Sequence, residues 1–312
     1  MEASRQHNAP LFGLNIDPSA RNRQLAFDLA RLADETNLDL ICVQDHPYNP
    51  AFFDTWTLLT ALGMATQEVH LLPNVLNLPL RPPAMLAKAA ATLDLLTDSR
   101  LEIGLGAGAF SEGVVSYGGP ARAPGEAVSA LEEALHILRM LWQPLPPGST
   151  VSFEGDYYQL HNVQPGPAPA HDIRIWLGAH KPRMLRVTGL LADGLLISST
   201  YIPPEEVPAV QRAVDEGAVQ AGRQPNAIRR GYNLMGSILT AGSRTVTAKQ
   251  RGLVFGNAQH WTNEILHYYN DLFLDTFTFW PVMGDEVRQA RIFVEEVVPT
   301  IKETLEKEQP ME

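Results

Sequence analysis

The chain contains 312 residues, of which 45% are hydrophobic, and its formal net charge is −11 at pH 7. This negative charge and the scattered acidic residues argue against a nucleic-acid-binding surface or a basic membrane-binding patch. No apolar run approaches the roughly 18 residues that span a bilayer, and the polar N-terminus lacks a signal-peptide core, so we expect a cytoplasmic protein. The single cysteine, Cys42, lies in an apolar run and cannot form an internal disulfide.

Short apolar runs, which predict strands, alternate along the chain with amphipathic stretches, which predict helices. The expected strands lie at residues 11–15, 40–43, 69–72, 101–104, 173–177, 194–197, 232–239 and 276–280. The expected helices lie at residues 21–37, 54–67, 83–96, 124–142, 181–191, 203–221 and 261–272, followed by a final helix with Ala290, Phe293, Val294, Val297 and Ile301 on one face. Pro83 suits the first turn of its helix, and Pro144 lies just beyond the helix at 124–142.

Two stretches depart from this alternation. Residues 144–170 are rich in proline and contain two alternating segments, 151–154 and 157–160, around a Gly-Asp turn, which predicts a hairpin inserted on the surface. Residues 241–256 resemble a basic loop, with Arg244, Lys249 and Arg251.

Eight units of strand then helix, without a break in composition, favour a (β/α)8 TIM barrel that forms a single domain over residues 1–312. A doubly wound parallel sheet is the alternative. In a barrel, functional residues lie in loops that leave the C-terminal ends of the strands. That rule selects residues 44–46, 73–75, 106–112, 178–180 and 198–199 and the 241–256 loop.

The glycine-rich loop from Gly104 to Ala109 follows the fourth predicted strand. Closely spaced glycines after a strand indicate that the backbone approaches another group closely. A dinucleotide-binding loop would follow the first strand and carry three spaced glycines and a later acid at the end of a strand. Here the third glycine is missing, and Glu126 lies in the first turn of a helix, so a rim loop of a barrel is favoured.

His46 directly follows a predicted buried strand, and Asp45 precedes it. Histidine exchanges protons near neutral pH, and a neighbouring carboxylate tunes its pKa, so His46 is the candidate catalytic residue. The sequence has no H-x-H after the first strand and no acidic cluster at ligand spacing, so we expect no metal site and disfavour a barrel hydrolase.

Several motifs together resemble those of one family. They are Asp45-His46, residues 73–77, the stretch from Arg100 to Gly108, the helix from Glu126 to Trp142, residues 153–158 and Ala192-Asp193-Gly194. In this order they resemble the bacterial luciferase-like superfamily, which comprises FMN-dependent monooxygenases and oxidoreductases that use the deazaflavin coenzyme F420. The resemblance covers nearly the whole chain.

The resemblance implies a TIM-like barrel, often dimeric, that holds a flavin-type ring at its rim. It implies a non-prolyl cis peptide bond between Asn74 and Val75, behind the ring, and a proton-transfer role for His46. It also implies a phosphate-binding helix start at residues 178–179. The implied cofactor-binding residues are Asp45, His46, Asn74, Val75, Asn77, Gly106, Ala107, Gly108, Ala109, Gly178, Ala179 and His180.

Two departures from the family pattern narrow the expected activity. Sugar-phosphate dehydrogenases of the F420 branch carry a glutamate where this chain has Ala109, and Glu112 lies three residues further on. Light-emitting luciferases carry a second histidine where this chain has Pro47. We therefore expect neither sugar-phosphate oxidation nor light emission.

Coenzyme F420 is favoured over FMN because Asp45-His46 resembles the F420 branch. The expected reaction is hydride transfer to or from a small organic substrate. The alternatives are an FMN-dependent monooxygenase and a flavin-binding protein without catalysis. The expected partners are the substrate, a second copy of the chain and a flavin or F420 reductase. Aromatic residues near the predicted rim suggest a partly hydrophobic pocket: Phe52, Phe53, Trp56, Phe110, Tyr201 and Trp280.

Overall fold

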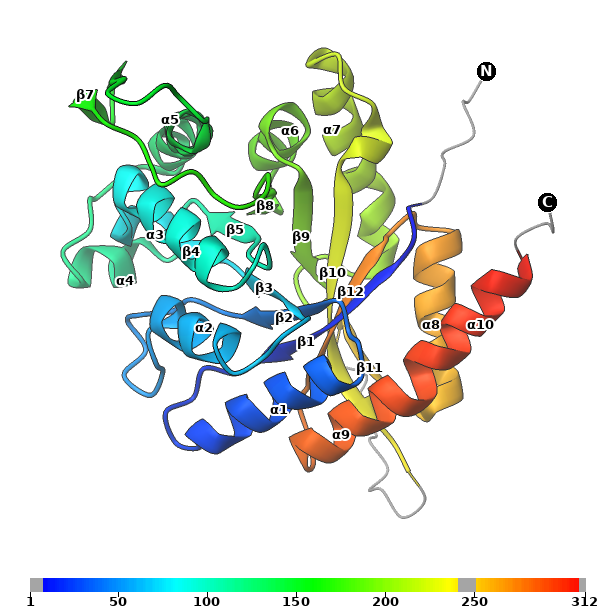
Figure 1. The fold of residues 1–312 in the computed structure, drawn as a ribbon. Coiled ribbons are helices and arrows are strands. Elements are labelled where there is room, and N and C mark those ends of the chain that lie inside the picture. The colour runs from blue at the N-terminus through cyan, green and yellow to red at the C-terminus, as the bar shows by residue number, and fades with distance from the viewer. Residues whose placement is uncertain (1–7, 241–250, 309–312) are drawn as a thin grey trace.

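Parallel strands form the centre of the molecule, and helices surround them (Figure 1). The structure is a computed structural model that describes residues 8–240 and 251–308. The central strands are β1 (Leu11–Ile16), β2 (Leu40–Val43), β3 (His70–Pro73), β4 (Leu76–Asn77), β5 (Ile103–Gly106), β8 (Ile175–Gly178), β9 (Gly194–Ser198), β10 (Arg229–Ile238) and β12 (Thr276–Pro281).

The strand order is β3-β2-β1-β12-β10-β9-β8-β5-β4, and all of these neighbours are parallel. β3 and β4 are two parts of one strand interrupted at residues 74–75. Counted in this way, eight strands lie in the ring that the described residues form. A parallel bridge between Leu71 and Leu101 brings the ends of the sheet together, so the barrel is nearly closed. The predicted (β/α)8 fold is confirmed.

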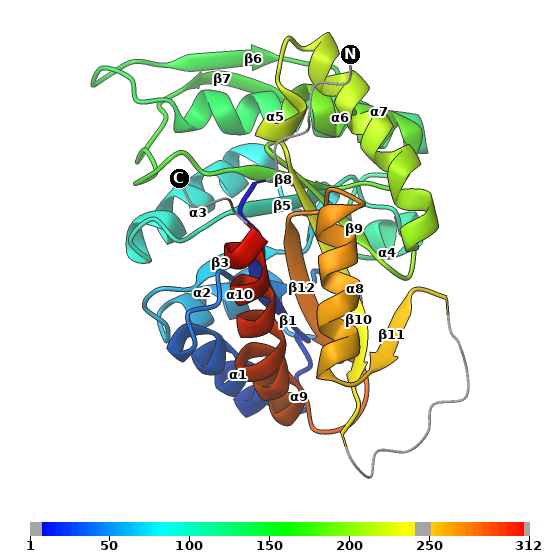
Figure 2. The ribbon, with the colours of Figure 1, turned by 90° about the vertical axis from the view of Figure 1, so that its right-hand side faces the viewer.

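Helices pack around this barrel (Figures 1 and 2). They are α1 (Arg23–Glu35), α2 (Thr55–Gly63), α3 (Pro83–Leu96), α4 (Ser111–Ser116), α5 (Pro124–Trp142), α6 (Pro182–Leu191), α7 (Val207–Gln220), α8 (Ala258–Asn270), α9 (Glu286–Ile292) and α10 (Val298–Glu308). Short 3-10 turns lie at Leu78–Leu80, Pro204–Glu206 and Pro225–Ala227, and a π-helical turn at Phe293–Val297 joins α9 to α10. No helix among the described residues is long and apolar enough to cross a membrane.

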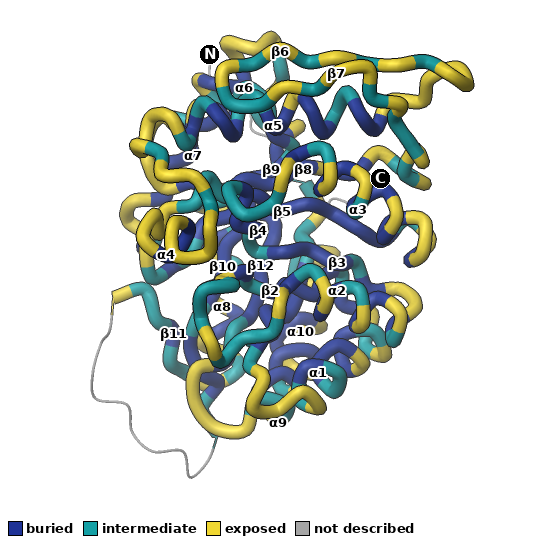
Figure 3. The backbone as a smooth tube through the Cα atoms, turned by 90° about the vertical axis from the view of Figure 1, so that its left-hand side faces the viewer, coloured by how far each residue is buried: buried dark blue, intermediate teal, exposed yellow. Residues whose placement is uncertain are grey.

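The core has an outer and an inner part. Strand residues that face outward, such as Phe12 and Phe277, join the helices in one large cluster, whereas Leu40, Cys42, Leu72, Trp176 and Leu196 form a separate cluster inside the barrel. Trp176 fills the interior beside Gly194, where an added Cβ would lie 2.2 Å from the indole ring. Figure 3 shows that the central strands are mostly buried.

The predicted hairpin is present as β6 (Val151–Glu154) and β7 (Gln159–Val163), and it lies beyond α5, away from the barrel (Figure 2). The Glu133 carboxylate of α5 accepts hydrogen bonds from the backbone N–H groups of Asp156, Tyr157 and Tyr158 at 2.8 to 3.0 Å. These bonds hold the two tyrosines in the turn, so the second strand begins two residues later than predicted.

The prediction of a loop over residues 241–256 is wrong for residues 253–256. Leu253–Gly256 forms strand β11, which pairs in parallel with Met235–Ile238 of β10. The apolar run of β11 is only four residues long and follows basic residues, which hides it in the sequence. Arg244 and Lys249 lie outside the described residues, whereas Arg251 forms an ion pair with Glu206.

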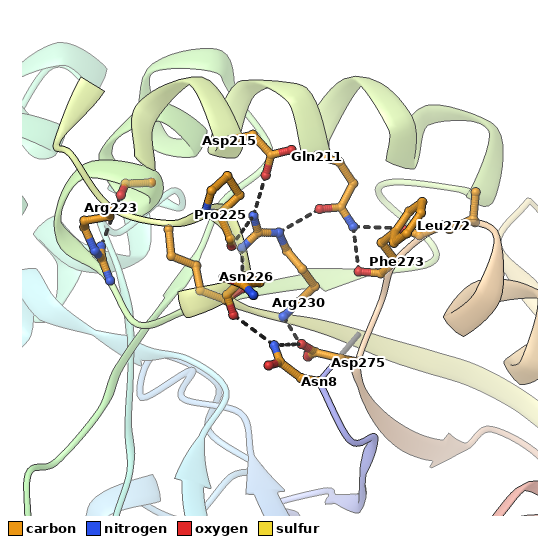
Figure 4. Close-up of polar contacts among 12 residues, drawn as sticks. Asn8, Gln211, Asp215, Arg223, Pro225, Asn226, Arg230, Leu272, Phe273 and Asp275 are labelled. Carbon is orange, nitrogen blue, oxygen red and sulfur yellow. Dashed lines mark hydrogen bonds and ion pairs between the residues drawn. The ribbon is translucent and has the colours of Figure 1, made fainter. Parts of the chain in front are cut away.

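A polar network holds the N-terminal ends of β1, β10 and β12 together (Figure 4). The buried Arg230 guanidinium donates to Gln211 Oε1 at 2.7 Å, to Asp215 Oδ1 at 2.8 Å and to the Ile228 carbonyl oxygen at 2.6 Å. The backbone N–H of Arg230 donates to the Asp275 carboxylate, which also accepts a hydrogen bond from the Asn8 side chain. This end of the barrel is therefore closed by structural contacts, and function is expected at the opposite end.

Candidate active site

The predicted site residues gather at the C-terminal ends of β2, β4, β5 and β8. Asn77 of β4 lies in register with Gly106 of β5, and its backbone N–H donates to Asp45 Oδ2 at 2.9 Å. Val75 lies against the glycines that end β5 and β8. The predicted residues at these strand ends therefore form one contiguous region of the rim.

The peptide bond between Asn74 and Val75 is cis, which confirms the predicted bulge between β3 and β4. An added Cβ at Gly106 or at Gly178 would lie 2.9 Å from Val75 Cγ2, and one at Gly104 would lie 2.0 Å from the Pro73 carbonyl oxygen. These glycines are therefore required for packing around the bulge. Gly108, with φ +84°, lies against Pro79 in the same way. Their contacts with a cofactor stay predictions.

Two polar side chains brace the bulge from across the barrel. Asn74 Nδ2 donates to Asn233 Oδ1 of β10 at 2.6 Å, and Asn233 Nδ2 donates back to Asn74 Oδ1 at 3.3 Å. Thr278 of β12 donates its hydroxyl hydrogen bond to the same Asn233 oxygen. Two strands far away in the sequence thus fix the orientation of the Asn74 amide.

Asp45 is buried and paired within the protein. Arg81 donates to both of its carboxylate oxygens, at 3.2 and 3.1 Å, and also to Asp54 at 2.8 Å. Burial opposes the charge of Arg81, but Asp45 and Asp54 raise its pKa overall. Burial likewise raises the pKa of Asp54, yet the hydrogen bonds from Arg81 and Thr57 outweigh it and lower that pKa. Asp45 therefore ties the β2 loop to β4 and Arg81.

His46 is exposed at the rim and contacts Tyr48, which in turn packs against Phe110. Its Nδ1 lies 2.7 Å from the Tyr48 hydroxyl, and the Tyr48 ring packs edge-on against Phe110 with centroids 4.9 Å apart. Partial burial lowers the pKa of His46 below 6.5, although Asp45 opposes this shift. Burial and the Asp45 charge raise the pKa of Tyr48, so its hydroxyl keeps its proton at neutral pH. When Tyr48 donates to Nδ1, the neutral imidazole carries its proton on Nε2.

The segment after β8 leads directly into helix α6. Ala179 is buried, and His180 stacks on the exposed Tyr201 with ring centroids 6.3 Å apart. Lys181 is the residue before the helix, no side chain caps the first turn, and Pro182 has no N–H group. The free N–H groups of this turn and the Lys181 charge suit an anion.

The rim also contains buried polar atoms that the described part of the chain does not satisfy. Asn77 Oδ1 and Ser199 Oγ have no hydrogen-bond partner there, although both residues are at least nine-tenths buried. Such groups are uncommon in folded proteins and suit a bound molecule with polar edges. Together with the apolar side chain of Val75, which packs on Gly106 and Gly178, they fit a flavin-type ring.

Other predicted rim residues are less closely linked to this region. Glu112 lies exposed in the first turn of α4, Ala107 packs partly against the outer core, and Ala109 is exposed. Phe53 and Trp56 pack partly against the outer core, whereas Phe110 and Tyr201 are 51% and 75% exposed.

Sequence reasoning missed Tyr48, Arg81, Asn233 and Thr278. Tyr48 carried a usable signal, because it lies two residues after His46 in the same loop. Asn233 and Thr278 occupy polar positions in otherwise apolar strands, which is a weaker signal. Their pairing with Asn74 depends on the closure of the barrel.

Comparisons with known proteins agree with this geometry. Residues 13–261 match the family model described as luciferase-like monooxygenase. The chain is 27% identical over 219 residues to 5,10-methylenetetrahydromethanopterin reductase of Archaeoglobus fulgidus, which covers 69% of this chain and 60% of that protein. It is 31% identical over 212 residues to F420-dependent glucose-6-phosphate dehydrogenase of Nocardia farcinica, covering 65% and 61%. The aligned part therefore spans about three fifths of the length of these relatives.

A solved structure shares the whole fold. The F420-dependent secondary alcohol dehydrogenase in complex with an F420–acetone adduct superposes with a TM-score of 0.80 at 20% identity, covering 94% of this chain and 99% of that chain. The match to the family model extends over most of the chain, and this match assigns the chain to a family. The chain belongs to the bacterial luciferase-like family of flavin- and deazaflavin-dependent oxidoreductases.

Proposed function

We propose that this protein is an oxidoreductase that uses coenzyme F420 for hydride transfer to or from a small organic substrate. The observation that carries the proposal is the interruption of the third strand at residues 74–75, which Asn233 and Thr278 brace at the same rim as the His46 imidazole. Bound F420 would supply the hydride-accepting or hydride-donating centre. The protein's own residues would supply orientation, a proton and protection from water.

In this proposal, Val75 forms the wall behind the ring, and Asn74 and Asn77 hydrogen-bond its polar edge. The N-terminus of α6 and Lys181 hold the phosphate of the cofactor. His46 exchanges a proton with the substrate oxygen through Nε2, since Tyr48 occupies Nδ1. Asp45 positions the loop that carries His46 and does not touch the substrate, because its carboxylate oxygens already accept hydrogen bonds from Arg81 and from the Asn77 N–H.

FMN is the alternative cofactor, and it would fit a monooxygenase reaction, which is the activity that the description of the matching family names. The names of two relatives support F420, since the Nocardia enzyme and the superposed structure are both described as F420-dependent. The substrates in those names are chemically diverse, so they do not define a substrate for this chain.

The proposal is tested by titrating purified protein with F420 and with FMN and following cofactor fluorescence. We expect saturable quenching of F420 at lower protein concentration than quenching of FMN. The reverse order would support the FMN alternative, and no binding of either cofactor would overturn the proposal.

The role of His46 needs a separate variant. We expect His46→Ala to bind F420 with a similar Kd but to turn over at least about tenfold more slowly, because one general acid–base group contributes about 10²- to 10⁴-fold. Normal turnover in His46→Ala would contradict the proton-transfer role while leaving cofactor binding intact.

We also propose that the protein is a homodimer and receives reduced cofactor from a separate reductase. Exposed apolar side chains on and next to α2 and α3 are candidates for the dimer contact: Met64, Met85, Leu95 and Leu96. Sedimentation at several protein concentrations tests the dimer, and a species of monomer mass throughout would exclude it.

A further inference from the structure

At the C-terminal end of β1, the buried side chain of Asn15 and the half-buried side chain of Asp17 carry polar atoms that have no hydrogen-bond partner among the described residues. Asn15 is 2% exposed, and neither its Nδ2 nor its Oδ1 has a hydrogen-bond partner among them. Two residues further on, Asp17 Oδ1 is also buried without a partner. A buried amide that neither donates nor accepts a hydrogen bond destabilises the fold. The presence of such an amide at Asn15 therefore points to a role in binding rather than in stability.

Strand register places the Asn15 side chain inside the barrel. Asn15 pairs with Cys42 of β2, which belongs to the inner cluster, while Leu14 and Ile16 belong to the outer core. Below it, an added Cβ at Gly13 would lie only 2.8 Å from Leu40 Cβ, so the interior there is filled. Asn15 therefore lies above a packed floor, at the end of the barrel that also holds Asn74.

Carboxyl groups lie just beyond Asn15, where the chain leaves β1. Asp17 follows it, and Glu286 at the start of α9 is close enough for the Asp17 charge to affect it. Burial raises the pKa of Asp17, and burial together with Asp17 raises the pKa of Glu286. These carboxyl groups disfavour a phosphate or carboxylate at this edge, because like charges repel strongly where water is partly excluded.

We propose that Asn15 is a substrate-binding residue that holds the hydroxyl or carbonyl oxygen of a neutral alcohol or ketone, and that Asp17 excludes anionic substrates. An amide suits this role, since Nδ2 donates to the oxygen and Oδ1 accepts from an O–H group. The inference rests on the proposed function and adds the class of substrate to it.

The test measures alcohol binding to the full chain saturated with reduced F420, which leaves the alcohol without a hydride acceptor. Calorimetry compares 2-propanol, cyclohexanol and 2-octanol with the matching carboxylates isobutyrate, cyclohexanecarboxylate and 2-methyloctanoate. We expect at least one alcohol to bind more tightly than its carboxylate. Failure of every alcohol to bind, or tighter binding of the carboxylates, would overturn the inference.

Asn15→Leu separates a binding role from a structural one. We expect alcohol Kd to rise about tenfold or more, because two hydrogen bonds are lost, while the thermal midpoint of the apo-protein rises, because an unpartnered amide is removed. An unchanged Kd or a lower midpoint would contradict the inference. Asn15→Ala gives the same Kd comparison if the leucine variant does not fold.

Asp17→Asn tests the exclusion of anions, with Asp28→Asn on the exposed face of α1 as the matched loss of one charge. We expect only Asp17→Asn to gain carboxylate binding. A gain in both variants, or in neither, would remove the role of Asp17. Fluorescence titration of each variant with F420 distinguishes the proposed function from the proposed role of Asn15. Normal F420 binding together with unaltered alcohol affinity would overturn the role of Asn15 and leave the proposed function standing.

Discussion

At the scale of single residues, the environment of each titratable group decides its role. His46 and Asp45 are neighbours in the sequence, yet one is exposed at the rim with a lowered pKa and the other is buried against Arg81. The sequence predicted the position of His46 from the end of a strand. It could not predict the pairing of Asp45, because Arg81 lies on the next strand–helix unit.

Tyr48 is expected to fix the tautomer of His46. In Tyr48→Phe the hydrogen bond to Nδ1 is lost, so we expect turnover to fall about tenfold while the Kd for F420 stays within about twofold. Steady-state kinetics and fluorescence titration check this, with Tyr117→Phe at an exposed position as control. Equal turnover in the two variants would show that Tyr48 does not act on His46.

Glu102, at the N-terminal end of β5, is expected to make stability depend on pH. Burial raises its pKa from 4.5 to about 7, despite the hydrogen bond that it accepts from the Arg174 N–H. The folded protein therefore binds this proton more tightly than the unfolded chain. The resulting stability is present in full below pH 4.5 and is lost as the pH rises through 7.

We expect Glu102→Gln to be more stable than the wild type at pH 8, by up to about 3 kcal/mol, and equally stable at pH 4.5. Urea unfolding at both pH values measures the difference, and Glu306→Gln on the exposed face of α10 is the control. A gain that is the same at both pH values would exclude titration of Glu102 as its cause.

At the scale of elements, proline and periodicity fixed two helices at the residues predicted, α3 at 83–96 and α5 at 124–142. The short β11 was missed, because it contains too few residues to show a period, whereas the bulge after the third strand was expected from the family resemblance. The glycine loop was found from the sequence, but the reason for its glycines was not. They make room for Pro73, Val75 and Pro79, and these contacts form only in the packed barrel.

Packing between Val75 and Gly178 is expected to couple their substitutions. Gly178→Ala places a Cβ 2.9 Å from Val75 Cγ2, so we expect the free energy of unfolding to fall by about 1 to 3 kcal/mol. In a protein that already carries Val75→Ala, the added methyl group has room. The destabilisation caused by Gly178→Ala should therefore be smaller there by about 1 kcal/mol. Chemical unfolding of the four proteins gives the coupling energy.

Gly125→Ala is the control for that cycle, because its nearest neighbour would lie 3.7 Å from the added Cβ. It should be neutral or slightly stabilising, since Gly125 is in the first turn of α5. Strict additivity of the Val75 and Gly178 substitutions would show that the two residues do not compete for space.

At the scale of the whole molecule, the two ends of the barrel differ in kind. The N-terminal end is closed by Arg230 and its partners, all of which are satisfied (Figure 4). The C-terminal end carries the bulge, the exposed His46 and Asn15, whose amide has no hydrogen-bond partner among residues 8–240 and 251–308. Alternating strands and helices predicted this division of the barrel. Which side chains meet across it depends on ring closure, which no local pattern encodes.

Arg230→Ala is expected to destabilise the fold by about 3 to 5 kcal/mol, because it leaves the polar groups of α7 buried with fewer partners. Thermal and urea unfolding measure this loss, with Arg288→Ala at an exposed position as control. Cofactor affinity of the folded variant should match the wild type, since the network lies at the other end. A large change in the Kd for F420 without loss of stability would contradict this separation.

The most direct test of the central claim is a crystal structure of the protein bound to F420. The account predicts the deazaflavin ring in van der Waals contact with Val75, its phosphate at the N-terminus of α6 and His46 beside its exposed edge. A ring bound elsewhere on the molecule, with the Asn74–Val75 bulge uncovered, would contradict it.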